Sequence, residues 1–259
     1  MDLSALLSLP KDGLLVFFLM FVRFSAMLVL APLFSQPQLP LRVRIGLALM
    51  VSMVLLPLEL HAPHARPAGL DGLLVAVAGE ATVGIILGFV AMLVFQAVAF
   101  AGYLIGLQMG FGMDSMYDPG TNQSVPALAV FLGVVASMVF LLADGHHYLL
   151  LALDHSLRVV PLGTFRFSAQ TMVSLVNATA GMFTTVFELV LPVLGVLLLT
   201  EVALAIMNRV MPQMNVFVAG FPLKIALGFL TIAVGLPLMV AYLDEAFGRM
   251  TRELLMFFG

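Results

Sequence analysis

The chain has 259 residues, of which 62% are hydrophobic and only 10% are charged, and its formal net charge is −3. Ordinary soluble domains carry roughly 25% charged residues, so this chain must bury its apolar surface in membrane lipid or against other apolar subunits. The weak negative charge supplies no basic patch, so we expect no nucleic-acid partner. The absence of cysteine excludes disulfides and thiolate metal sites.

Six apolar segments follow one another along the chain, at residues 14–34, 45–60, 73–107, 125–143, 172–199 and 225–243. A membrane-spanning helix needs ~20 apolar residues, and an open sheet would leave its backbone unsatisfied in lipid. The pattern therefore predicts an all-α membrane protein. We expect about six hydrophobic helices, arranged as kinked helical hairpins in a single subunit that covers residues 1–259.

Some segments fit simple membrane spans poorly. Residues 73–107 would form a helix of ~52 Å, which exceeds a hydrocarbon core of ~30 Å. We expect this segment to tilt, to break or to protrude into other protein. Pro192 and Pro237 lie inside the last two segments and predict kinks there. Residues 144–170 and 201–224 are polar enough to indicate connections between helices.

Glycines recur every fourth residue at two places in the chain. Gly102, Gly106 and Gly110 form one set, and Gly84 and Gly88 form the other. Small residues at this spacing let helix backbones approach closely, so we predict helix packing at Gly84, Gly88, Gly102 and Gly106. The alternative is chance spacing in a chain that contains 22 glycines.

Three charged residues interrupt the apolar segments: Arg23, Glu80 and Glu188. A charge in the middle of a membrane costs ~2.5–3.5 kcal/mol on insertion scales, so it usually faces a partner or a water-filled cavity. Arg23 and Glu80 could instead reach the membrane interface from helix ends. Glu188 lies deeper in its segment, which favours a functional or inter-subunit role, but the sequence names no partner for it.

The central stretch, residues 102–126, loses the hydrophobic pattern and contains no Lys or Arg. It is either a plain connecting loop or irregular backbone that lines a space enclosed by protein. Met109, Met113 and Met116 could form a soft, adaptable seal in it, because methionine side chains are flexible. A second methionine set, at positions 207, 211 and 214, we interpret as ordinary core filling.

The histidines and aspartates around residues 144–155 suggest a metal site at first sight. His146 and His147 are adjacent, however, and their side chains diverge on a helix, so we expect no metal. No phosphate-binding loop and no nucleophile elbow occurs, so we expect no cofactor and no enzyme activity. Two alternatives remain open: an intramembrane enzyme that uses this cluster, and a secondary transporter of small solutes with helices broken at Pro192 and Pro237.

Three longer strings carry a resemblance. They are GLQMGFGMDSMYDPGTNQSVPAL at residues 106–128, LLADGHHYLLLALDHSLRVVPLG at 141–163, and FVRFSAMLVLAPLFSQPQLPLRVRIGLAL at 21–49. The chain resembles the FliR family of flagellar biosynthetic proteins, the R/T family of type III secretion export gates. This family includes the T-type subunit of virulence secretion systems, but the GLQMG string is more similar to the flagellar branch.

The resemblance implies a subunit of the flagellar type III export gate in the bacterial inner membrane, within the flagellar basal body. It implies assembly with FliP-like and FliQ-like subunits, and then with FlhB-like and FlhA-like subunits, into a channel for unfolded flagellar proteins. The implied fold resembles a fusion of FliP and FliQ within a helical assembly, much of which stands above the membrane plane. Membrane lipid is a further expected partner.

The resemblance also implies that the loop at residues 110–124 projects into the channel as a plug. We infer apolar contacts from Phe111, Met113, Met116 and Tyr117, hinges at Gly110, Gly112 and Gly120, and polar anchors at Asp114 and Asp118, with Ser115 and Pro119 between them.

Overall fold

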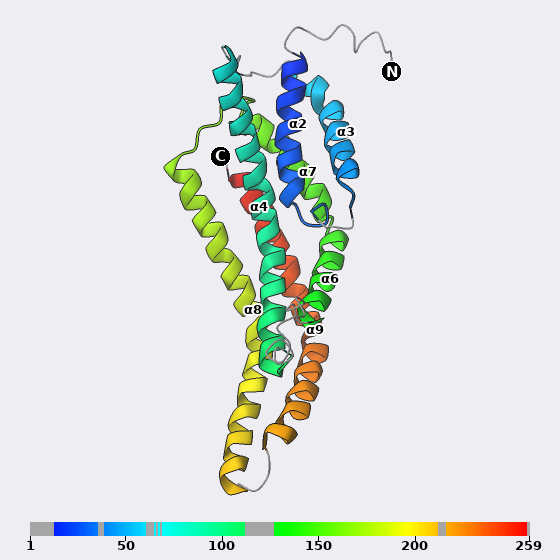
Figure 1. The fold of residues 1–259 in the computed structure, drawn as a ribbon, viewed down its shortest axis with the longest axis vertical. Coiled ribbons are helices and arrows are strands. Elements are labelled where there is room, and N and C mark those ends of the chain that lie inside the picture. Colours follow the sequence, from blue (N-terminus) through cyan, green and yellow to red (C-terminus); the bar gives the residue numbers. More distant parts are fainter. Residues whose placement is uncertain are drawn as a thin grey trace, which may run out of the picture. The chain divides into compact units, whose positions relative to one another are not determined.

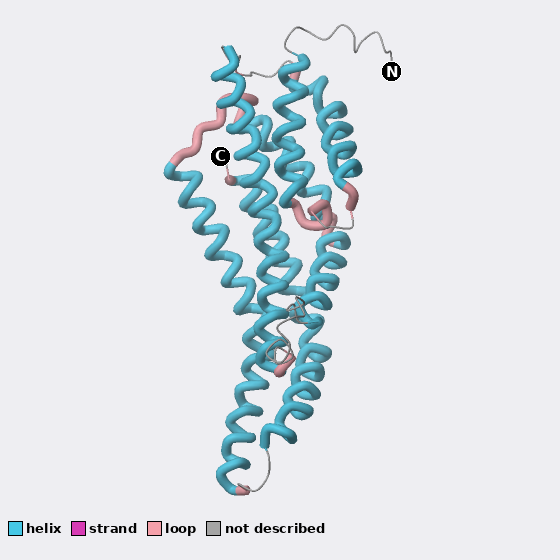
Figure 2. Tube along the Cα trace, in the orientation of Figure 1, coloured by secondary structure: helices cyan, strands magenta, loops and turns pink. Residues whose placement is uncertain are grey.

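The computed structural model describes residues 13–35, 39–60, 65, 67, 69–111, 127–211 and 216–257, without the side chains of residues 216–219. Within these residues the chain forms seven α-helices and no strand, which confirms the all-α prediction (Figure 1). The helices are α2 (Gly13–Leu30), α3 (Leu41–Glu59), α4 (Gly69–Met109), α6 (Ala127–Leu142), α7 (Gly145–Val159), α8 (Ala169–Val210) and α9 (Val216–Met256). Figure 2 shows how little of the described chain lies in loops.

Five of these helices are long and apolar enough to cross a membrane. They are α2, α3, α4, α8 and the part of α9 from Gly220 to Met256. The pair α6 and α7 passes the same test together, bent by 65° at the break between them. The described residues thus hold five such helices, or six if the bent pair is one span, which agrees with the expected number.

The structure settles one open alternative and corrects one expected connection. The long third segment does not break, because α4 runs for 41 residues, ~62 Å at ~1.5 Å per residue. Residues 201–210 and 216–224, expected in a connection, continue α8 and begin α9. Neither Pro192 nor Pro237 ends its helix, since a proline removes a single backbone hydrogen bond and the turns on both sides keep theirs.

Helix α7 was missed because its sequence is polar for this chain. Asp154 and Arg158 are responsible for much of that polarity. On the helix they lie one turn apart and form an ion pair at 2.9 Å, and Arg158 is largely exposed. A polar stretch between two apolar segments therefore became a helix with one solvated face, and not a loop.

The chain divides into two compact units. The first comprises Met1–Leu93, His146–Thr179 and Met250–Gly259. In this unit α2 packs against α3 (Figure 1). Its core is formed by large side chains that are almost fully buried, among them Leu19, Met20, Phe24, Met27, Leu87, Leu149, Leu153 and Leu162.

The second unit comprises Val94–Gly145 and Ala180–Arg249. Three aromatic rings pack together in it: Phe95, Phe140 and Phe247, with centroids 5.2–5.5 Å apart. Edge-to-face and tilted contacts of this kind are favourable because the positive edge of one ring meets the negative face of another. A side chain at Gly145 would collide with the Phe140 ring, so only glycine fits at the start of α7.

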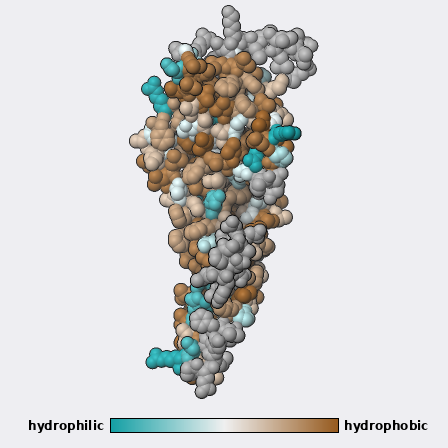
Figure 3. All heavy atoms as spheres, in the orientation of Figure 1, coloured by the Kyte–Doolittle hydropathy of each residue, from teal (hydrophilic) through white to brown (hydrophobic). Residues whose placement is uncertain are grey.

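Much of the described surface is apolar, as the brown atoms in Figure 3 show. On α8 the exposed large apolar residues of the second unit include Phe183, Phe187, Leu191, Leu198, Leu199, Val202, Ile206, Met207 and Val210. Soluble monomers rarely expose apolar surface on this scale, so lipid or protein must cover it.

Candidate functional site

Arg23 and Glu80 form a fully buried ion pair in the first unit. Arg23 Nε donates to Glu80 Oε2 at 2.6 Å, and both side chains are 0% exposed. The remaining Arg23 nitrogens donate to Ser156 Oγ at 3.2 Å and to the Val160 carbonyl at 3.0 Å. Glu80 Oε1 accepts a hydrogen bond from the Gly163 backbone N–H at 2.7 Å.

This network joins α2, α4, α7 and the turn that follows α7. Each charged atom that takes part has a partner, which is the condition under which a buried charge is tolerated. Arg23 and Glu80 therefore do not reach out to the membrane interface, and that alternative is wrong. Sequence reasoning missed Ser156 and Gly163, because an ordinary serine and a turn glycine give no signal of such a role.

Glu188 has a partner within its own chain. Arg249 Nη2 donates to Glu188 Oε2 at 2.7 Å, and Arg249 Nη1 donates to Glu188 Oε1 at 3.3 Å. Arg249 also donates to Thr185 Oγ1 and to Glu245, each at 3.3 Å. The arginine and Glu188 side chains are 31% and 27% exposed, so this ion pair is much less enclosed than the one at Arg23.

The glycines at 84 and 88 lie against the backbone of α2. A Cβ at Gly84 would collide with the Arg23 carbonyl, and a Cβ at Gly88 would lie 2.6 Å from the Met27 carbonyl. In the second unit a Cβ at Gly102 would lie 2.6 Å from Ala129 Cα on α6. These helices approach closely enough that each position excludes a side chain.

Helix α4 ends at a glycine with a left-handed backbone. Gly110 has φ +98°, its N–H donates to the Leu107 carbonyl at 3.0 Å, and the Phe111 N–H donates to the Gly106 carbonyl at 3.0 Å. These two bonds form a Schellman motif, in which a residue with positive φ closes the helix. The loop that follows α4 therefore starts at Gly110.

The rest of the expected plug lies outside the described residues: Gly112, Met113, Asp114, Ser115, Met116, Tyr117, Asp118, Pro119 and Gly120. Its first two members, Gly110 and Phe111, are described. The Phe111 ring contacts the Phe229 ring on α9 with centroids 6.0 Å apart. The roles inferred for these residues stay predictions.

Two members of the second methionine set are described. Met207 on α8 and Met211 directly after it are 48% and 51% exposed, so the core-filling interpretation is wrong for these two, and Met214 lies outside the described residues. Met109, in contrast, is 0% exposed.

Among the described residues, no group of three His, Asp or Glu side chains could hold a metal ion.

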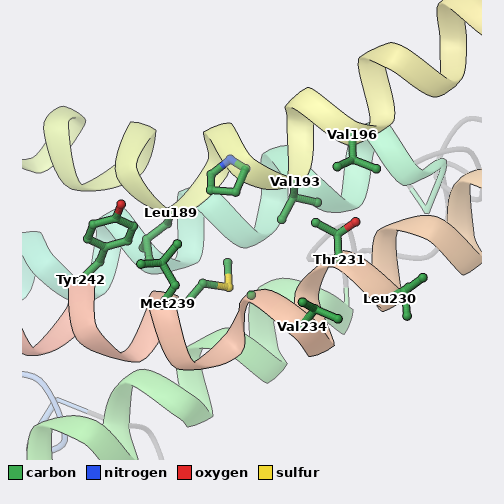
Figure 4. A pocket seen from close by; sticks show the side chains of 11 residues that line it. Leu189, Val193, Val196, Leu230, Thr231, Val234, Met239 and Tyr242 are labelled. Atoms are coloured by element: carbon green, nitrogen blue, oxygen red, sulfur yellow. The ribbon is translucent and has the colours of Figure 1, made fainter.

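An apolar cavity of about 330 Å³ lies between α8 and α9 in the second unit (Figure 4). Its lining residues are Leu189, Pro192, Val193, Val196, Leu230, Thr231, Val234, Gly235, Leu238, Met239 and Tyr242. The Thr231 hydroxyl donates to the Leu227 carbonyl of its own helix at 2.7 Å. The lining contains no charged residue, so the cavity offers no counter-charge to an ionic solute.

These features define an integral membrane protein of long apolar helices, in which Arg23 pairs with Glu80 and Glu188 pairs with Arg249. The chain belongs to the family described as Bacterial export proteins, family 1, whose sequence pattern matches residues 14–250. This confirms the resemblance based on residues 21–49, 106–128 and 141–163.

Two relatives named Flagellar biosynthetic protein FliR are each 32% identical to the chain. The one from Escherichia coli (strain K12) matches over 234 residues, 90% of this chain and 89% of that protein. The one from Bacillus subtilis (strain 168) matches over 238 residues, 89% and 90% of the two chains. The Yop proteins translocation protein T of Yersinia pestis is 27% identical over 241 residues, 92% of each chain.

Proposed function

We propose that this chain is a subunit of the flagellar type III protein export gate in the bacterial inner membrane. With FliP-like and FliQ-like subunits it forms a channel for unfolded flagellar proteins, and FlhB-like and FlhA-like subunits join the assembly. The chain is needed for flagellum assembly, is not itself an enzyme and needs no cofactor. Membership of the export family and the identity to the FliR proteins over most of both chains support this proposal.

The observation that carries the assembly is the length of the exposed apolar face on α8. Within the second unit this face runs from Phe183 to Val210, at 49% and 74% exposure. The distance between these residues along the helix is ~40 Å, whereas the hydrocarbon core of a bilayer is ~30 Å thick. Lipid cannot cover all of a face this long if the helix crosses the bilayer upright. Other apolar subunits are the natural cover for the remainder.

A self-contained solute transporter explains fewer of these structural features. Such a protein should present paired charges or polar backbone at a central substrate site between its broken helices. The cavity beside Pro192 and Gly235 is lined mostly by apolar side chains and by no charged residue. The similarity to the Yop translocation protein T keeps a virulence secretion subunit as a second candidate.

Complementation separates the two secretion functions. Expressed in a bacterium that lacks its own FliR protein, the chain should restore flagellar filaments and swimming. Mass measurement of the intact assembly, after affinity purification from membranes, should show FliP-like and FliQ-like partners. Rescue of a virulence needle system in place of flagella would favour the second candidate. A solitary chain in the purified material would contradict both.

The plug has its own test. We propose that residues 110–124 hold the resting channel closed, as the family resemblance implies. Deletion of residues 111–116 should make the purified complex leak ions after reconstitution into vesicles, while co-purification with the partner subunits continues. Unchanged ion permeability in a fully assembled complex would contradict the plug.

A further inference from the structure

The end of α4 rests on one face of α9. We propose that Phe221, Gly228 and Phe229 of α9 form a seat that holds residues 109–111 and sets the direction in which the chain leaves α4. These positions are seven and eight residues apart, so they lie on one side of the helix, two turns from end to end. The proposal rests on the proposed plug function, since the seat matters for export only if the following loop closes the channel.

The first contact is at Gly110. A Cβ at this position would lie 2.7 Å from the Phe221 ring, and the backbone has φ +98°. The positive φ strains any residue with a side chain, and the ring leaves no room for one. Phe221 and the Schellman bonds therefore hold Gly110 from two sides.

The second contact is at Met109. Its side chain is 0% exposed, and its Cε, Sδ and Cγ atoms would lie 2.7–2.8 Å from a Cβ at Gly228. The whole outer part of the thioether chain therefore lies where an alanine methyl group would project. Gly228 is the residue that allows Met109 to pack directly on the backbone of α9.

The third contact is the ring pair of Phe111 and Phe229. Their centroids are 6.0 Å apart at an interplanar angle of 69°, a favourable edge-to-face geometry. Phe111 is 37% exposed and Phe229 is 50% exposed, so this pair forms the outer rim of the seat. Three successive residues of the α4 end thus each contact a different residue of α9.

Helix α8 contacts α9 next to the seat. Lys224, which lies between Phe221 and Gly228, donates to Glu201 of α8. A Cβ at Gly220 would lie 3.1 Å from Leu204 Cδ1, so α8 and α9 are also close there. The exposed apolar face of α8 is available to partner subunits. Because α8 contacts α9 and α9 holds residues 109–111, a shift of α8 and α9 would also shift the start of the loop.

Variants of the seat should open the resting channel without any change in the loop itself. We expect Gly228→Ala to raise the ion leak of the reconstituted complex above that of the unaltered complex, because the Met109 side chain must shift to make room for the methyl group. Gly195→Ala on α8 is the matched control, because a Cβ there would meet nothing within 4 Å, and it should keep the channel sealed. Met109→Ala combined with Gly228→Ala should restore much of the seal, since the smaller side chain makes room for the added methyl group.

Phe229→Ala keeps the test decisive if Gly228→Ala fails to assemble. It removes a half-exposed ring and should leak less than the deletion but more than the Gly195→Ala control. If the deletion leaks while both Gly228→Ala and Phe229→Ala stay as tight as the unaltered complex, the seat is overturned and the plug stands.

A crosslinking measurement decides the seat even if the plug proposal fails. The chain contains no cysteine, so Phe111→Cys with Phe229→Cys introduces a single pair of thiols. A short bifunctional thiol reagent should join them in the assembled complex. A pairing of Phe111→Cys with Glu245→Cys, which lies ~24 Å from position 229 along α9, should not react. Absence of the first crosslink in the assembled complex would overturn the seat, whatever the leak measurements show.

Discussion

Removal of the Glu80 charge is the sharpest test of the buried network. Glu80→Gln keeps the length of the side chain and an oxygen that can still accept from the Gly163 N–H. It leaves the Arg23 guanidinium, which is 0% exposed, without the carboxylate that forms its ion pair. Breaking a buried pair in this way costs ~3–5 kcal/mol, a large share of a typical folding stability of ~5–15 kcal/mol.

A second substitution shows whether the stranded charge is the cause. Arg23→Met combined with Glu80→Gln removes both charges and keeps apolar volume at position 23. The double variant loses only hydrogen bonds, at ~1–3 kcal/mol for each buried group left unsatisfied, so it should be more stable than Glu80→Gln alone. Glu245→Gln is the matched control: its carboxylate is 62% exposed and pairs with Arg249 one turn away, so the cost should be ~0.5 kcal/mol or less.

The assay is denaturant unfolding of the purified protein in detergent, followed by circular dichroism because the chain contains no tryptophan. We expect the largest fall in the transition midpoint for Glu80→Gln, a smaller fall for the double variant and almost none for Glu245→Gln. The account of the network would be wrong if Glu80→Gln unfolded at the same denaturant concentration as the unaltered protein. It would also be wrong if the double variant were the least stable of the three.

Two further predictions follow from the same geometry. Gly84→Ala should lower the free energy of unfolding by ~1–3 kcal/mol, because the added methyl group meets the α2 backbone. Gly46→Ala is the control and should not lower it, because a Cβ there meets nothing within 4 Å. Equal unfolding midpoints for the two variants would contradict this prediction. Glu188→Gln should lower the free energy of unfolding by only about 1 kcal/mol, since Arg249 is partly exposed and retains other partners. A loss as large as that of Glu80→Gln would show that the stability contributed by these ion pairs does not depend on their exposure.

The seat and the network occupy different units and make separate predictions. Loss of the network should lower the stability of the chain, whereas Phe229→Ala should change the ion permeability of the complex with little effect on stability. A variant series that carries both measurements would separate folding defects from defects of the closed channel. This matters for an assembly subunit, because an unstable chain and a leaky channel both reduce export in a living cell.

Much of the architecture follows from the sequence alone. Apolar runs of membrane length determine an all-α fold, because only helices satisfy the backbone within one segment in lipid. The glycines at 84, 88 and 102 lie at close helix contacts, and four-residue spacing was a local signal for this. The polar run that forms α7 gave the opposite signal, since its apolar face emerges only when the helix packs on its neighbours.

Tertiary structure decided which charges meet. Glu80 lies 57 residues from Arg23, Ser156 lies 133 residues from it, and Arg249 lies 61 residues from Glu188. The sequence determined that such charges inside apolar segments needed partners, because an unpaired charge is costly there. It could not name the partners, since pairing depends on which helix faces meet in space, and on packing contacts between residues far apart in the chain.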